Sequence, residues 1–280
     1  MRILLKIVLW IICAAAIPLS MFAEPVIDVV IPTCSKDLEI LNLCIRGVKE
    51  NCKNVRRIIV VSPEHVTNEA EWFDEKNYPF TKQEIALYLN HMNQSAADRF
   101  LRESGRVGWY YQQLLKLYAA YVIPGIASNV LIVDSDTVFL RPVEFISPEG
   151  GGYFATGREY HQPYFAHAAR FLPGLVRVYP DKSGVVHHML FQRPILDELF
   201  DAVEDYHQVD LWKAFCYCVD LKHLGTSGAS EYEIYFNFAL SHSDEVSIRE
   251  LKWKNSGYPG SINEHRREGY DYVSYHSYLR

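Results

Sequence analysis

Short β-branched runs alternate with segments of helical periodicity along the first half of the chain. Apolar runs that end in turn-forming or polar residues predict strands at 26–31, 57–61 and 129–133. Between them, helical spacing predicts a helix capped by Ser35 and running to about Glu50, and further helices at 81–103 and 109–122. Strands that alternate with helices in this way predict a mostly parallel sheet with helices on both faces.

The second half of the chain mixes the two patterns. Extended segments are expected at 153–156, 185–191 and 270–278, and helices at 194–206, 211–217 and 231–240. Neither an internal repeat nor a low-complexity linker divides the chain. We therefore expect one domain, over residues 24–280.

Residues 1–23 have the pattern of a targeting segment. Arg2 and Lys6 precede an apolar run, and Ala23 comes directly before Glu24. A basic start, a short apolar run and a small residue before a polar one predict a secretory signal, or an uncleaved anchor that would associate the protein with a membrane. Either would place the domain outside the cytoplasm, in a periplasm or lumen or in the medium.

Composition narrows the function further. Hydrophobic residues make up 49% and charged residues 22%, which excludes a disordered chain. A formal charge of −6 argues against nucleic-acid binding. The 19 tyrosines suit either a sugar-binding groove or a tyrosine-rich core. Five of the six cysteines follow the targeting segment, and this odd number favours small buried thiols, with or without one disulfide.

An Asp-x-Asp motif, Asp134-Ser135-Asp136, follows the apolar strand at 129–133. The carboxyl end of such a strand delivers both carboxylates to the crevice where open α/β sheets bind ligands. Hard divalent cations prefer oxygen ligands of this kind. Two alternatives stay open. The aspartates could be solvated turn residues, or Asp134 could be the nucleophile of a haloacid-dehalogenase-type phosphatase, although the motif lies mid-chain and no later acidic pair follows it.

Four segments together resemble the GT-A fold nucleotide-sugar glycosyltransferases, in particular glycogenin-like and bacterial members. They are the strand at 26–31 with Pro32-Thr33, the helix with Lys116-Leu117, the run 133–142 around the Asp-x-Asp motif, and Tyr275-His276-Ser277. The resemblance implies a Rossmann-type, mixed but mostly parallel sheet flanked by helices in a single domain. It also implies a nucleotide-diphosphate sugar donor and a divalent metal ion.

The resemblance further implies particular site residues. Asp136 and His276 would be metal ligands, and Asp134 a ligand or a ribose contact. Thr33 and Ser135 would contact the donor. Mn²⁺ suits a mixed carboxylate and imidazole set, with Mg²⁺ as the alternative.

The helix before the motif supports this interpretation. Leu114, Leu117, Tyr118 and Tyr121 have the spacing of a buried stripe. Lys116 on another face could pair with a diphosphate, while Gln112 or Gln113 could bond a base or a sugar hydroxyl. An exposed amphipathic face is the plain alternative.

Three further residues are candidates for catalysis. Ser230-x-x-Glu233 reads as a capping box, which would leave Glu231 free to face the crevice as the base, with Glu233 in reserve. His187 and His188 would point to opposite faces of a strand. We expect His188 to contact the sugar or the acceptor, although a core histidine is an equal alternative.

The sequence thus predicts a metal-dependent transferase that moves a hexose from a nucleotide diphosphate sugar, in the first place a UDP-sugar, to a carbohydrate or lipid-linked acceptor. Its rival is an exported sugar-binding or host-interaction protein with the same fold. Export would separate an enzyme from donors made in a bacterial cytoplasm, which is the argument in favour of this rival.

Overall fold

The structure is a computed structural model that describes residues 25–257 and 259–279. The targeting segment predicted for residues 1–23 lies outside the described residues. Within them, no helix combines the length and the apolar character needed to cross a membrane.

A five-stranded sheet forms the centre of the fold. Its strands, in spatial order, are β3 (Glu71–Asp74), β2 (Val55–Ser62), β1 (Ile27–Pro32), β4 (Asn129–Val133) and β7 (His188–Gln192). The pairs β2–β3, β1–β2 and β1–β4 are parallel, and β7 pairs antiparallel with β4. This mixed, mostly parallel sheet flanked by helices confirms the predicted α/β fold class.

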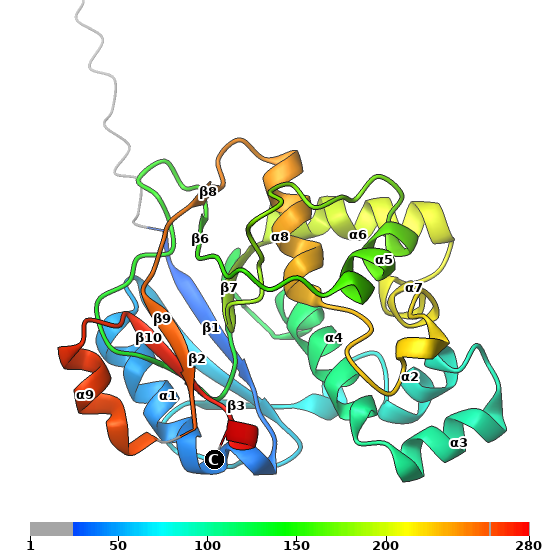
Figure 1. Cartoon of the computed structure of the whole chain (residues 1–280), viewed down its shortest axis with the longest axis horizontal. Coiled ribbons are helices and arrows are strands. Elements are labelled where there is room, and N and C mark those ends of the chain that lie inside the picture. Colours follow the sequence, from blue (N-terminus) through cyan, green and yellow to red (C-terminus); the bar gives the residue numbers. More distant parts are fainter. Residues whose placement is uncertain (1–24, 258, 280) are drawn as a thin grey trace, which may run out of the picture.

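Helices cover both faces of the sheet, as the alternating pattern predicts. In Figure 1, α1 (Leu38–Asn51) lies on one side, and α4 (Arg106–Val122), α6 (Arg193–His207) and α8 (Glu231–His242) lie on the other. The remaining helices are α2 (Lys82–Leu89), α3 (Gln94–Glu103), α5 (Gln162–Phe171), α7 (Leu211–Tyr217) and α9 (Ile262–Arg267). Strands β1 and β4 are almost wholly buried between these layers, which explains their continuous apolar sequences.

Two small sheets complete the fold. One contains β5 (Thr137–Phe139), β10 (Tyr272–Tyr275) and β9 (Trp253–Ser256), and the other pairs β6 (Tyr153–Phe154) with β8 (Ser247–Ile248). The pairing of β10 with β5 matters for function because it brings the end of the chain beside the Asp-x-Asp loop. The N–H of Tyr275 donates to the carbonyl of Asp136 over 2.8 Å.

Two local predictions are wrong. The helix expected over 81–103 is two helices, α2 and α3, because His91 and Met92 between them have positive φ angles of 50° and 64°. Ser35 does not cap α1, since a 3-10 turn over Ser35–Asp37 precedes Leu38 and Asp37 occupies the N-cap position. The five described cysteines are free thiols, and four of them are buried, as expected for small apolar residues.

Candidate active site

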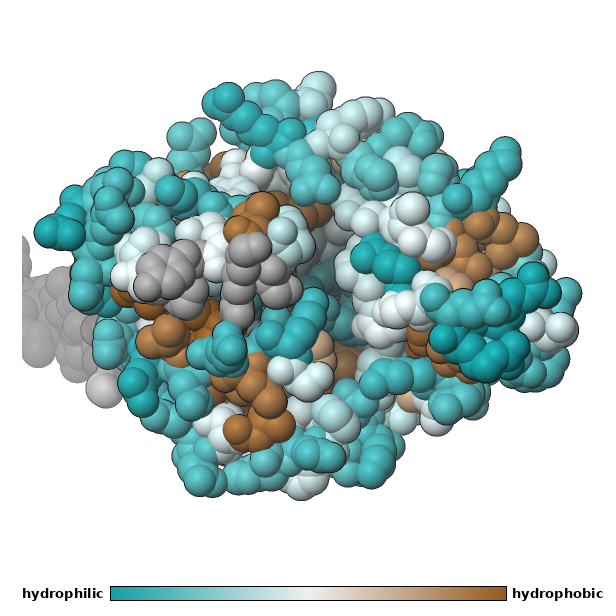
Figure 2. Space-filling view, turned by 60° about the horizontal axis from the view of Figure 1, so that its bottom comes forward, coloured by the Kyte–Doolittle hydropathy of each residue, from teal (hydrophilic) through white to brown (hydrophobic). Residues whose placement is uncertain are grey.

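A cavity of about 420 Å³ opens at the carboxyl edge of the parallel strands. Figure 2, which brings this edge forward, shows a hollow near the middle of the face. The loop after β1, helix α4, the loop between β4 and β5, the start of α8 and the C-terminal segment all contribute to its wall. We call it the first cavity. The Asp-x-Asp motif therefore lies in a cavity at the sheet edge predicted for it.

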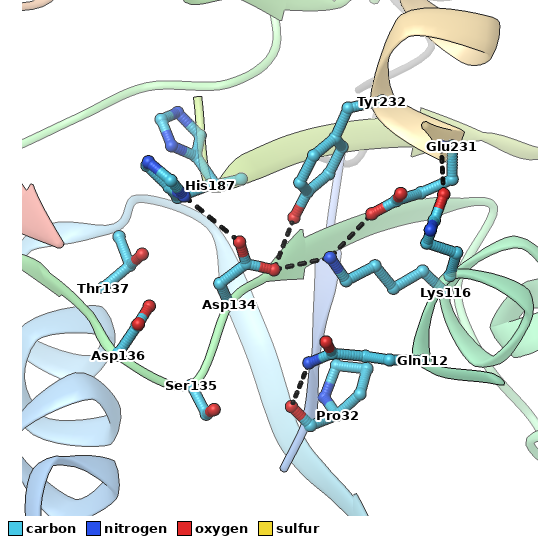
Figure 3. Close-up of polar contacts among 12 residues, drawn as sticks. Pro32, Gln112, Lys116, Asp134, Ser135, Asp136, Thr137, His187, Glu231 and Tyr232 are labelled. Atoms are coloured by element: carbon cyan, nitrogen blue, oxygen red, sulfur yellow. Dashed lines mark hydrogen bonds and ion pairs between the residues drawn. The ribbon is translucent and has the colours of Figure 1, made fainter. Parts of the chain in front are cut away.

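Asp134 accepts from three side chains at the base of this cavity (Figure 3). Lys116 Nζ and the Tyr232 hydroxyl lie 2.6 Å and 3.1 Å from Oδ1. His187 Nδ1 lies 3.3 Å from Oδ2. Both oxygens of Asp134 are thus engaged by groups of the protein itself.

Lys116 joins Asp134 to Glu231. Its Nζ lies 2.6 Å from Glu231 Oε1, and the side chains of both residues are only 5% exposed. Glu231 is the first residue of α8, and Gln113 on α4 accepts from its backbone N–H over 3.0 Å. Lys116 and Gln113, which were predicted to contact the sugar donor, therefore hold Glu231, the residue predicted to act as the base.

The charges of this group stabilise one another. Burial acts to raise the pKa of Asp134, but Lys116 and His187 outweigh it and hold that pKa below its usual range. Burial acts to lower the pKa of Lys116, and Asp134 and Glu231 reverse this effect. Burial raises the pKa of Glu231, with Lys116 opposing the rise. Lys116 is therefore a cation, and Asp134 an anion, at neutral pH.

Asp136 and His276 meet in the same cavity. Asp136 Oδ2 lies 2.9 Å from His276 Nδ1, although 140 positions separate the two residues. The Nε2 atom of His276 is buried and has no hydrogen-bond partner within the described residues. Nearby, Asp37 accepts from the Ser135 hydroxyl over 3.0 Å. Burial raises the pKa of Asp37; Lys36 opposes this rise, while Asp136 and Asp134 add to it.

The acidic and imidazole side chains of the first cavity include candidate ligands for a divalent metal ion. In residues 25–257 and 259–279, no three His, Cys, Asp or Glu side chains are grouped so as to hold such an ion. Asp136 and His276 remain a suitable pair, because small divalent cations often take one or two protein ligands and complete their shell with substrate phosphates and water. The buried Nε2 of His276 is the kind of atom that a metal ion would satisfy, and Asp136, bonded to Nδ1 of the same ring, would then orient that imidazole. Asp136 and His276 thus fit a metal site. The carboxylate oxygens of Asp134, in contrast, are already bonded to Lys116, Tyr232 and His187.

Residues 24–257 match the sequence profile of a family described as a family of unknown function, DUF6492. The chain belongs to this family. No curated protein shows detectable similarity to this DUF6492 member. Among solved structures, it is similar to mouse xyloside xylosyltransferase 1 in its apo form. That similarity has 12% sequence identity and a TM-score of 0.47, and it covers 91% of this chain and 99% of the mouse chain.

Two catalytic predictions need correction in this DUF6492 protein. His188 does not face the first cavity but lies in the core against Phe139, Phe145 and Tyr272, and burial lowers its pKa to about 3. The neighbouring His187 lines the cavity instead. His187 has a φ of 67°, which is outside the range of a β-strand, so β7 begins only at His188. The two imidazole rings therefore lie in different environments.

Glu233 also lies away from the first cavity. Its N–H donates to Ser230 Oγ over 3.3 Å, which is one half of the predicted capping box. Its carboxylate instead accepts from Ser183 Oγ and from Asn237 Nδ2. Glu233 therefore stabilises the packing of α8 and does not face the first cavity, so it cannot serve there as the alternative base.

The remaining predicted donor contacts line the cavity or its neighbour. Gln112, Gln113, Lys116 and Ser135 line the first cavity. Thr33 lines a second cavity of about 280 Å³, which also includes Gln112 and begins where β1 ends. Gln112 Nε2 donates to the carbonyl of Pro32 over 3.4 Å and so lies between the two spaces.

Sequence reasoning missed several residues of the wall. They are Asp37, Arg106, Tyr164, Tyr232, Trp253 and Tyr278. Tyr232 could have been suspected because it follows Glu231 at the start of a helix. The others come from segments whose place near the site depends on tertiary structure alone.

Proposed function

We propose that this protein is a metal-dependent glycosyltransferase that uses a nucleotide-diphosphate sugar, in the first place a UDP-sugar. The observation that supports this most is the meeting of Asp136 with His276 in the cavity that also contains Lys116 and Glu231. The sequence motifs that resemble GT-A glycosyltransferases are the ones that come together there. The acceptor would be a carbohydrate or a lipid-linked glycan.

Asp136 and His276 would hold Mn²⁺ or Mg²⁺ in this scheme. A bound divalent ion stabilises the negative charge that develops on a departing diphosphate without any proton transfer. Asp134 would act indirectly, because its carboxylate keeps Lys116 charged and in place at the base of the first cavity.

Glu231 is the group best placed to accept a proton from the acceptor hydroxyl. It lines the first cavity, and its pKa is raised by burial, which makes the carboxylate a better base. Lys116, 2.6 Å away, fixes the carboxylate and favours its ionised form, the form that accepts a proton. If the reaction retains the anomeric configuration, the same carboxylate would orient the substrate instead.

The test is donor hydrolysis and transfer by the purified protein with a panel of nucleotide sugars, with and without Mn²⁺. We expect metal-dependent release of nucleotide diphosphate that Asp136→Ala abolishes. Asp205→Ala is the control, because Asp205 is exposed on α6 and does not line the first cavity. Sugar binding that is indifferent to metal, without turnover, would support a non-catalytic binding protein. Hydrolysis of an aryl phosphate would support a phosphatase.

A further inference from the structure

The second cavity lies beside the first and has a different character. The two cavities share Lys36, Arg106, Trp109 and Gln112. The second is formed where β1 ends and where α4 begins. Its charged lining residues are three cations, Lys36, Lys82 and Arg106, and one acid, Glu75, whereas the first cavity contains the aspartates of the Asp-x-Asp motif.

Arg106 is a cation without an anionic partner. Its Nε donates to the carbonyl of Thr226 over 2.8 Å and its Nη2 to Ser227 Oγ over 2.9 Å. The guanidinium lies 4.3 Å from the ring centre of Trp109. Both acceptors are neutral, and no carboxylate pairs with Arg106 in the described part of the chain. Burial accordingly lowers the pKa of Arg106, so the fold bears the cost of a desolvated charge here.

The N-terminus of α4 opens into the same space. This 17-residue helix begins at Arg106, and its N-cap residue, Gly105, provides no side-chain acceptor. Ser104 Oγ accepts from the N–H of Arg106 over 3.2 Å, which leaves the first-turn N–H groups of Val107 and Gly108 without an acceptor in the helix. Gly105 and Gly108 line the second cavity, and open space lies where a Cβ atom would be. A ligand can therefore approach the positive end of the helix dipole closely.

Thr33 supplies an independent indication of a ligand. Thr33 lines the second cavity and is only 6% exposed. Its Oγ1 has no hydrogen-bond partner among residues 25–257 and 259–279. A buried hydroxyl without a partner is costly in a native protein. A bound acceptor atom would satisfy it.

The charges around this hydroxyl are positive on balance. The acidic residue in the lining, Glu75, is already paired with Lys82, whose Nζ lies 3.0 Å from Oε1. Lys36 and Arg106 remain without an ion-pair partner in the part of the chain that the structure describes.

We propose that the second cavity is a binding site for an anionic group, a phosphate or a carboxylate, held by Arg106, Thr33 Oγ1 and the first turn of α4. Because the two cavities adjoin, this anion belongs either to the nucleotide donor itself or to a separate ligand, such as an acidic acceptor. The two sources share the same chemistry and differ in whether the nucleotide competes for the site.

The experiment is calorimetric titration of inorganic phosphate into the intact protein in the presence of EDTA, so that no metal ion contributes. We expect saturable binding that Arg106→Gln weakens at least about tenfold and Thr33→Val at least about threefold, as expected for the loss of a charged and a neutral hydrogen bond. Arg102→Gln is the control, since Arg102 is exposed on α3 and lines neither cavity. Circular dichroism and thermal melting check that each variant is folded, and Thr33→Val, which conserves shape, remains informative should Arg106→Gln fail to fold.

A second titration identifies the source of the anion. Phosphate is titrated into protein saturated with UDP and, in parallel, with uridine. Exclusion of phosphate by UDP but not by uridine assigns the site to the phosphate of the nucleotide, and unimpaired phosphate binding beside UDP assigns it to a separate ligand. Either result supports an anion site if Arg106→Gln removes the signal. No saturable phosphate binding, or binding that neither variant weakens, overturns the proposal, and both outcomes are independent of any transferase activity.

Discussion

Replacement of Lys116 by methionine tests the buried charge group at the base of the first cavity. Lys116 Nζ lies 2.6 Å from both Asp134 and Glu231, and its side chain is 5% exposed. Removal of one member of such a buried group leaves uncompensated charge, which typically costs about 3–5 kcal/mol. Asp134 keeps its bonds from Tyr232 and His187, so we expect a loss of about 3 kcal/mol in the free energy of unfolding at pH 7.

This loss should depend on pH in a defined direction. Without Lys116, burial and the Asp134 charge are opposed only by a backbone hydrogen bond and raise the pKa of Glu231 in the folded state further above its unfolded value. A carboxyl group with a raised folded pKa destabilises the fold above its unfolded pKa, and protonation relieves this as pH falls. The deficit of the variant relative to wild type should therefore be smaller at pH 5 than at pH 7.

Urea denaturation followed by circular dichroism at the two pH values measures this difference. Lys116→Met/Glu231→Gln should recover about half of the loss, because the second change removes the carboxylate left without a cation. Lys49→Met is the matched control, since its partner Glu69 is on the surface and such pairs contribute little. A loss no larger than that of Lys49→Met, or one that does not change between pH 5 and pH 7, would refute the reasoning.

Four further outcomes follow from the same contacts. Asp136→Asn and His276→Gln should each weaken Mn²⁺ binding about 10- to 100-fold, measured by electron paramagnetic resonance of free Mn²⁺, because the two side chains meet at 2.9 Å in the first cavity. Glu231→Gln should abolish transfer, whereas Glu233→Gln should lower the melting temperature and leave the rate of the folded protein unchanged, which rate assays below the melting transition would show. Asp28→Asn should cost about 1–3 kcal/mol in urea denaturation at pH 7 because Asp28 accepts from Arg56, Arg57 and the N–H of Ala127. These partners outweigh burial and lower the pKa of Asp28, so its contribution is present above about pH 4 and is lost as pH falls through the folded pKa. Gly184→Ala should cost about 1–3 kcal/mol in the same assay, because its Cβ would lie 2.5 Å from Phe236 Cβ.

The fold was predictable where the apolar pattern was long and consistent. Strands β1, β2 and β4 and helices α4, α6 and α8 lie within a few residues of their predicted positions because each buries a continuous face. Strand β3 was missed since Glu71–Asp74 is only four residues long, with acidic residues at both ends and little burial, and its place is fixed by pairing with β2. Helix α5 was missed because its pattern is mixed, although Pro163 in its first turn was an available signal.

The site was predictable only in part. Asp136 and His276 were expected together from a resemblance, and the pairing of β10 with β5 is what joins them. The contact of Lys116 with Glu231 joins residues 115 positions apart and depends on how α4 and α8 pack, which no local pattern reports. The choice between His187 and His188 rested on the φ angle of a single residue, and strand alternation alone could not decide it.

The charges of the two cavities fit the two ends of one kind of ligand. In the first cavity, the single cation Lys116 contacts both Asp134 and Glu231, so one negative charge of this group remains unbalanced beside those of Asp136 and Asp37. Burial and the neighbouring carboxylates Asp136 and Asp134 raise the pKa of Asp37, against the opposing effect of Lys36. In the second cavity, Arg106 and Lys36 are cations without an ion pair in the described residues. A ligand that brings a cation to Asp136 and an anion to Arg106 satisfies both, and because Gln112 and Trp109 line both cavities, one molecule can reach from one to the other. A phosphorylated ligand that carries its own divalent ion meets this requirement, whereas a neutral saccharide alone would leave both sets of charges unpaired.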